Sequence, residues 1–252
     1  MSVEDRNVRI IESNHDNFGI VELNLGQTVA TGIDIEHQPG VEEMKYYQKL
    51  LELIDNNQTI VLPYFPPELD QGVLRGMSIG ARFANWILKK DGSYDFYMKI
   101  ADYCATKNKK VLCPDYHTGK DFYVMYGLTR VVNMPWGLLS GIEEWRSSGY
   151  YHRGVEPGKE LFLYKWMPDV EDMRNALTAR AMLMYQMDNK SDNMLYVASG
   201  DHVRHVFDYA RDIYYDQGGF QARKAMAYSR LSIAPVPRLY TYADGKWEPN
   251  SI

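Results

Sequence analysis

Apolar and polar positions along the chain form blocks that predict short strands separated by helices. Runs rich in β-branched residues predict buried strands at residues 8–13, 59–65, 110–113 and 193–198. Apolar residues three or four apart predict helices at residues 41–56, 72–89, 93–107, 121–132, 138–147, 169–187 and 203–216. Residues 161–166 fit either a strand or the start of a helix. We expect an irregular tail, or a short hairpin near Asp244–Gly245.

Strands that alternate with helices favour an α/β fold, here a mainly parallel sheet flanked by helices, with helical insertions. No linker-like stretch interrupts the 252 residues, so we expect one domain over residues 1–252. A helical lid subdomain around residues 116–165 is an open alternative within it. In such sheets a ligand binds beyond the carboxyl ends of the strands, so that edge is where we expect a site.

Composition and charge exclude several classes of protein. The net charge is −5 with no basic cluster, which argues against nucleic-acid binding. No apolar run reaches about 18 residues, so we expect no membrane span. No secretory signal is visible at the start of the sequence, and Cys104 and Cys113 form no CxxC pair. We therefore expect a cytoplasmic protein with two reduced, buried thiols, one on a helix and one on a strand.

Three of the four predicted strands are followed within a few residues by a histidine: His15, His117 and His202. Glu12 and His15 lie where the first strand opens into a loop, and such a pair could share a proton or hold a metal. A polar turn explains the same residues equally simply. Three further candidates for substrate binding follow other strands: Asp115 and His117, for which structural capping is an equal alternative, and Glu68.

The segment Ser199-Gly200-Asp201-His202 follows the last predicted strand and opens the next helix. At a helix amino terminus an imidazole tends to be neutral, as a base requires. Ordinary capping by Ser199 or Asp201 is the alternative.

The preceding helix carries two arginines, Arg174 and Arg180. They lie six residues apart, so only one of them can easily point at a given cleft. Such an arginine could bind a substrate carboxylate or a developing oxyanion, although surface ion pairing is the common alternative. The markers of P-loop NTPases, Rossmann cofactor sites, zincins and serine hydrolases are absent from the sequence.

Three segments resemble one superfamily, which groups erythromycin esterase-like proteins, haem-binding ChaN lipoproteins and TraB/Tiki metalloproteases. IESNH resembles that superfamily's GExxH motif at Glu12 and His15, and NHDN is similar to a run in ChaN proteins. MRNALTARAM resembles an RNxxMA pattern at Arg174 and Asn175. YVASGDHV is similar to its final GxxH-like turn at His202, although Ile11 and Ser199 replace glycines of the two motifs.

The resemblance implies a hydrolase of the erythromycin esterase type acting on an ester, amide or related bond in a small molecule or peptide. His15 would activate water with support from Glu12, His202 would be a second base, an acid or a metal ligand, and Arg174 would stabilise negative charge. A lyase or cyclase using the same residues, or a ChaN-like haem binder, are the alternatives. The cofactor is open: a divalent metal is the first choice and haem the second. The aromatic content makes a homodimer a further expectation.

Overall fold

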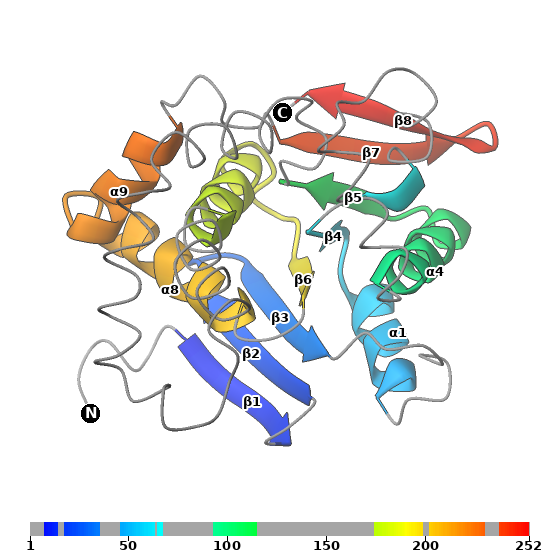
Figure 1. Cartoon of the computed structure of the whole chain (residues 1–252), viewed down its shortest axis with the longest axis horizontal. Helices are drawn as coiled ribbons and strands as arrows, with labels where there is room; N and C mark the ends of the chain where they lie inside the picture. Colours follow the sequence, from blue (N-terminus) through cyan, green and yellow to red (C-terminus); the bar gives the residue numbers. More distant parts are fainter. Residues whose placement is uncertain are drawn as a thin grey trace, which may run out of the picture.

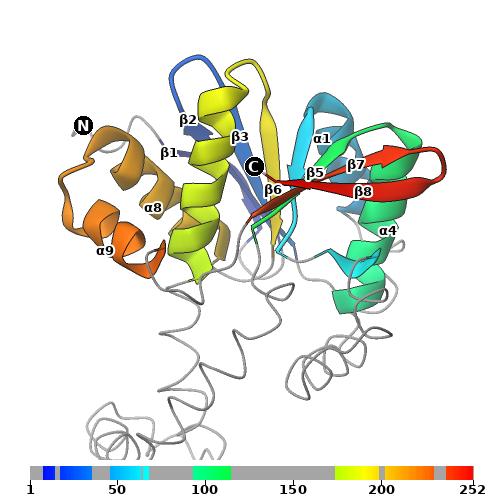
Figure 2. The ribbon, with the colours of Figure 1, turned by 90° about the horizontal axis from the view of Figure 1, so that it is seen from above.

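The computed structural model describes residues 8–14, 18–35, 46–63, 65–67, 93–114, 174–198, 202–229 and 237–251. Within them the chain has an α/β fold, in which a mixed sheet of eight strands lies between two groups of helices (Figure 1, Figure 2). The α/β class expected from the sequence is therefore confirmed.

The strands are short, and each has a defined neighbour in the sheet. Their bounds are β1 Val8–Asn14, β2 Phe18–Asn24, β3 Val29–Ile35, β4 Thr59–Val61, β5 Lys110–Cys113, β6 Met194–Ala198, β7 Arg238–Ala243 and β8 Lys246–Ser251. The helices are α1 Tyr47–Asn56, α4 Ser93–Thr106, α8 His202–Tyr215, α9 Phe220–Ser229 and a helix at residues 174–188. None of these described helices has the length and apolar character needed to cross a membrane.

The sheet order is β1-β2-β3-β6-β4-β5-β7-β8, and only its centre is parallel. Strands β3, β6, β4 and β5 run in one direction, whereas β1–β2, β2–β3, β5–β7 and β7–β8 are antiparallel pairs. Most pairs are antiparallel, so the expectation of a mainly parallel sheet was wrong. The difference arises because short turns add antiparallel strands at both edges.

The first predicted strand is present, but it is not buried. β1 lies at the edge of the sheet, and the side chains of Ile10 and Ile11 are 58% and 43% exposed. A β-bulge interrupts its pairing with β2 between Ile10 and Glu12. Its apolar composition resembles that of a central strand, and this explains why the sequence alone placed it in the interior.

Two tight turns join two of the antiparallel pairs, β2–β3 and β7–β8. The β2–β3 turn places Gly26 at φ +82°, and its N–H donates to Asn24 Oδ1 at 3.0 Å. The β7–β8 turn has positive φ at both Asp244 and Gly245, as a two-residue hairpin of type I′ requires. The second hairpin is the one expected from the sequence, whereas β2 and β3 were not predicted.

The remaining predicted elements divide into three groups. α4, β5, β6, α8 and the helix at 174–188 match their predicted ranges closely, and α1 covers the described part of the helix predicted at 41–56. β4 ends at Val61, earlier than predicted, and α9 was not predicted. The predictions at 72–89, 121–132, 138–147 and 161–166, and the lid around 116–165, lie outside the described residues.

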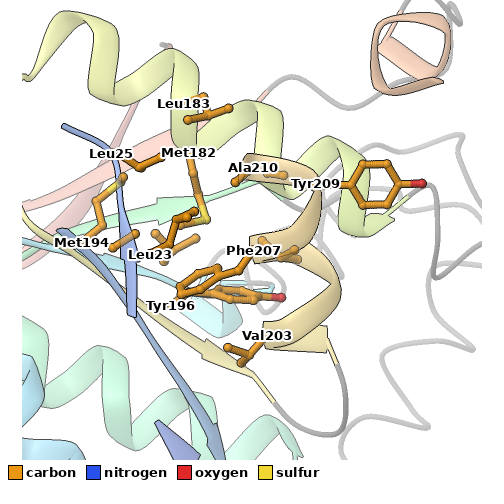
Figure 3. Packing of buried hydrophobic residues seen from close by; sticks show 14 of the residues in the cluster. Leu23, Leu25, Met182, Leu183, Met194, Tyr196, Val203, Phe207, Tyr209 and Ala210 are labelled. Carbon is orange, nitrogen blue, oxygen red and sulfur yellow. The ribbon is translucent and has the colours of Figure 1, made fainter. Parts of the chain in front are cut away.

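Each face of the sheet is covered by its own apolar cluster. α1 and α4 pack on one face, against Ile20, Ile33 and Ile35. The 174–188 helix, α8 and α9 pack on the opposite face, where Figure 3 shows Phe207 of α8 beside Tyr196 of β6. These are called the α1 face and the α8 face below. The central strands are buried on both faces because helices cover them from both sides.

Helix α8 approaches β3 very closely at Gly32. A Cβ atom at this position would overlap the side chain of Val203 and would lie 2.9 Å from Cζ of Phe207. Only glycine leaves room for both apolar side chains of α8. The position of the start of α8 over the sheet therefore depends on this residue.

A polar network joins the 174–188 helix to the amino ends of the central strands. Tyr185 Oη donates to Asp192 Oδ2 at 2.8 Å, and Lys110 Nζ donates to the same oxygen at 3.0 Å. Thr59 Oγ1 lies 3.0 Å from Tyr185 Oη. Burial disfavours the ionised carboxylate of Asp192, but the hydrogen bonds from Lys110 and Tyr185 outweigh it and hold the pKa of Asp192 below its usual 3.8.

Replacing Gly32 by alanine should destabilise the fold. The new methyl group would force α8 away from β3, and we expect a loss of about 1–3 kcal/mol in the free energy of unfolding, measured by urea denaturation. Gly218→Ala is the control, since the nearest atom to a Cβ there is 4.0 Å away. The double variant Gly32→Ala/Val203→Ala should recover part of the lost free energy of unfolding, because the smaller side chain on α8 leaves room for the new methyl group. A Gly32→Ala protein as stable as the wild type would contradict the close approach.

The Asp192 network should stabilise the protein only above the acidic range. Because the folded-state pKa of Asp192 is lowered, its contribution is present above about pH 4 and is lost as the pH falls through the folded-state pKa. Asp192→Asn should therefore have a lower free energy of unfolding than the wild type at about pH 6. The difference between the two proteins should become smaller towards about pH 3. Asp188→Asn, at an exposed position, is the control. A difference in the free energy of unfolding that does not change with pH would argue against the ion pair of Asp192 and Lys110.

Candidate functional site

The carboxyl ends of the parallel strands lie at one edge of the sheet, which we call the carboxyl edge. β1 runs in the same direction as β3, because each is antiparallel to β2. The segments that follow β1, β5 and β6 therefore leave from this edge, as the sequence reasoning requires. However, two strands separate β1 from β6 and one separates β5 from β6. His15 and His117 themselves lie outside the described residues.

His202 is the first residue of α8, and its ring is held by a buried amide. Its Nδ1 lies 3.1 Å from Oδ1 of Asn175, in the first described turn of the 174–188 helix. The imidazole is half-buried and Asn175 is only 4% exposed. Both helices start at the carboxyl edge and run back towards the amino ends of the strands. Their two starts thus hold the imidazole between them.

The two arginines of the 174–188 helix occupy different environments. Arg180 is on the helix side that carries Met184 and Met187, which are 40% and 73% exposed, so it faces away from the sheet. Both arginines are half-buried, but Arg174 directly precedes Asn175. Of the two, Arg174 is therefore the one placed beside the start of α8, whereas substrate binding by Arg180 gains no support.

Asp34 is a carboxylate that the sequence reasoning missed. It stands near the end of β3, two residues after Gly32, and therefore points to the same α8 face. Gly32 lies beneath Val203 of α8, and Asp34 is the next residue of β3 on this face, towards the carboxyl edge. Its cross-strand neighbours are small: Gly19 on β2 and Ala198 on β6. The missed signal was the strand pattern of residues 29–35, where an acidic residue ends an apolar run.

Glu12 is not brought together with His202. The bulge in β1 pairs Glu12 with Ile20, whose side chain belongs to the α1 face. Glu12 is exposed, and it lies three strands away from β6 on the face opposite to α8. Any pairing of Glu12 with His15 stays a prediction, as do the roles of His15, Glu68, Asp115 and His117, which all lie outside the described residues.

The described side chains supply acid–base groups but no complete metal centre. Within the described ranges, no group of three or more His, Cys, Asp or Glu side chains is close enough to hold a metal ion. Asp34, Arg174 and His202 each make further interactions in the structure. This edge thus combines an imidazole, a carboxylate and a guanidinium, which suits proton transfer and stabilisation of negative charge.

A comparison with protein-family models, curated proteins and solved structures finds no match to this chain.

The two cysteines are not part of this edge chemistry. Cys104 on α4 and Cys113 on β5 form no disulfide and are buried in the cluster of the α1 face, as expected of two buried thiols, one on a helix and one on a strand. Burial raises the pKa of the Cys104 thiol to about 12. A thiol in this state is a poor nucleophile, so the chemistry of the site falls to other groups.

Neither thiol should react while the protein is folded. At about pH 8 a thiol of pKa about 12 is ionised to roughly one part in ten thousand, and the reagent cannot reach either sulfur without local opening. Ellman's reagent should therefore label the native protein very slowly and release both thiols at once in denaturant. Rapid labelling of one thiol in the native protein would contradict the burial and would make that cysteine a candidate nucleophile.

Proposed function

We propose that this protein is a hydrolase that cleaves an ester, amide or related bond in a small molecule or peptide. The observation that carries the proposal is the imidazole of His202, which a buried amide holds at the carboxyl edge of the central strands. An oriented, half-buried imidazole at the usual ligand edge of an α/β sheet is the arrangement expected of a general base.

The groups beside His202 support the same reaction. In the proposed mechanism the imidazole removes a proton from water, and the resulting hydroxide attacks the carbonyl carbon of the substrate. Arg174 stabilises the negative charge that develops on the carbonyl oxygen. The imidazolium of His202 then returns its proton to the leaving group. Asp34 adds a carboxylate to the same face of this edge.

The sequence motifs add independent support. Arg174, Asn175 and His202 are the residues that resemble the second and third motifs of the erythromycin esterase-like superfamily. They come from segments that are 27 residues apart in the sequence, yet Asn175 and His202 are in hydrogen-bond contact. Their meeting at one point is what a shared site requires. A divalent metal at this edge, with His15 completing the site, remains part of the proposal to be tested.

His202→Gln should remove the activity and leave the fold intact. Loss of the general base should lower kcat by at least about 100-fold, because acid–base catalysis contributes factors of this size. We would measure hydrolysis of p-nitrophenyl acetate, p-nitrophenyl butyrate and a peptide p-nitroanilide, with circular dichroism and thermal melting on the same samples. His205→Gln is the matched control, since His205 is exposed one turn later in α8.

Elemental analysis and a visible spectrum of the same purified protein separate the alternatives. A stoichiometric divalent metal that is lost in His202→Gln would make the hydrolysis metal-assisted. A wild-type protein inactive on all three probes would contradict the proposal, and a Soret band in that protein would favour the haem-binding alternative. Equal activity of the wild type and His202→Gln would remove His202 from the mechanism.

A further inference from the structure

Asn175 is a buried polar side chain whose oxygen atom has a partner in the described part of the chain. It is 4% exposed and is followed in the 174–188 helix by apolar Ala176 and Ala179, which pack in the cluster of the α8 face. A buried amide is costly unless it forms hydrogen bonds, so its orientation is determined by the partners it finds. The partner of its Oδ1 atom is Nδ1 of His202, at 3.1 Å.

This contact has a consequence for the protonation of the imidazole. With the amide oriented so that Oδ1 faces the ring, this oxygen accepts a hydrogen bond, and Nδ1 of His202 is then the nitrogen that donates the hydrogen. In the neutral ring the lone pair then resides on Nε2. The hydrogen bond made by one ring nitrogen thus decides which nitrogen acts as a base.

We propose that Asn175 is a positioning residue that holds His202 in the Nδ1–H tautomer and thereby makes Nε2 the nitrogen that takes the proton from water. The inference rests on the proposed function for its kinetic part, whereas the tautomer itself can be observed without any substrate. An amide oxygen suits this role, because it accepts the hydrogen of Nδ1 and so fixes both the tautomer and the orientation of the ring.

Both helices that carry the pair are fixed at their far ends. The 174–188 helix is held by the hydrogen bond of Tyr185 to Asp192, and α8 by the hydrogen bond that Tyr215 Oη donates to the carbonyl oxygen of Asn24 at 2.9 Å. The position of Asn175 relative to His202 is therefore set by two anchored helices. A rigid support of this kind is what keeps a catalytic side chain in a productive orientation.

The tautomer can be measured directly by nitrogen NMR on protein labelled with ¹⁵N-histidine. The His202 signals are identified by their loss in His202→Gln. We expect the wild type to carry its hydrogen on Nδ1, and Asn175→Asp to keep it there because the carboxylate also accepts. Asn175→Leu has a similar volume but no acceptor, and should shift the hydrogen towards Nε2. Thr178→Val, at an equally buried position one turn later, should leave the signals unchanged.

The kinetic test measures the hydrolysis of the p-nitrophenyl esters by the same variants. Asn175→Leu should lower kcat at least about 100-fold with little change in KM, as expected for a base in the wrong tautomer. Asn175→Asp should recover most of the rate, and Thr178→Val should match the wild type. Equal melting temperatures would exclude a loss of folding as the cause.

The possible failures are distinguishable. A wild-type His202 with its hydrogen on Nε2 would overturn the inference, whatever the activity. A tautomer that shifts in Asn175→Leu without any change in kcat would show that Asn175 is only structural, and would also overturn it. If the wild type cleaves no probe, the proposed function fails together with the kinetic role, and the NMR signals still decide whether Asn175 sets the tautomer.

Discussion

The arrangement at the carboxyl edge depends on how closely helix α8 can approach strand β3. Gly32 is the residue that permits this approach, because any Cβ there would overlap Val203. The side chains of Val203 and Phe207 can then pack directly on the central strands, where they are fully buried. Since α8 starts with His202, the same contact fixes the start of the helix that carries the imidazole. A single steric constraint in the core thus determines where the candidate base stands.

The polar side chains at the two ends of the parallel strands lie in different environments. At the amino ends, the side chains of Thr59, Lys110, Tyr185 and Asp192 satisfy one another and join three secondary-structure elements and the loop before β6. At the carboxyl edge, Asp34, Arg174 and His202 are half-buried and remain close to solvent. Satisfied polar groups give rigidity, whereas partly exposed charged groups at the usual ligand edge can act on a substrate. The network at the amino ends of the strands thus helps to hold the side chains at the carboxyl edge in place.

Much of the fold could be predicted from the sequence, because helices with one apolar side and short buried strands leave clear periodic patterns. The helices at α4 and α8 and the strands β5 and β6 were found in this way. β2 and β3 were missed, since Gly19 and Gly32 interrupt their apolar runs and polar residues alternate with apolar ones. The directions of the strands could not be predicted either. The two hairpins depend on turn geometry at Gly26 and Gly245, which the periodicity of apolar residues does not reveal.

The candidate site shows why spacing in the sequence does not determine which side chains meet. In a regular strand Glu12 would share a face with Ile10, whose partner Val21 packs on the α8 face. The extra residue in the bulge moves Glu12 to the α1 face instead, because a shift of one residue reverses every later side chain. The carboxylate on the α8 face is instead Asp34, from a strand that carries none of the recognised motifs. A motif can therefore lie at the expected edge of a sheet and still have its carboxylate on the face opposite to α8, since the face is decided by the local register of a single strand.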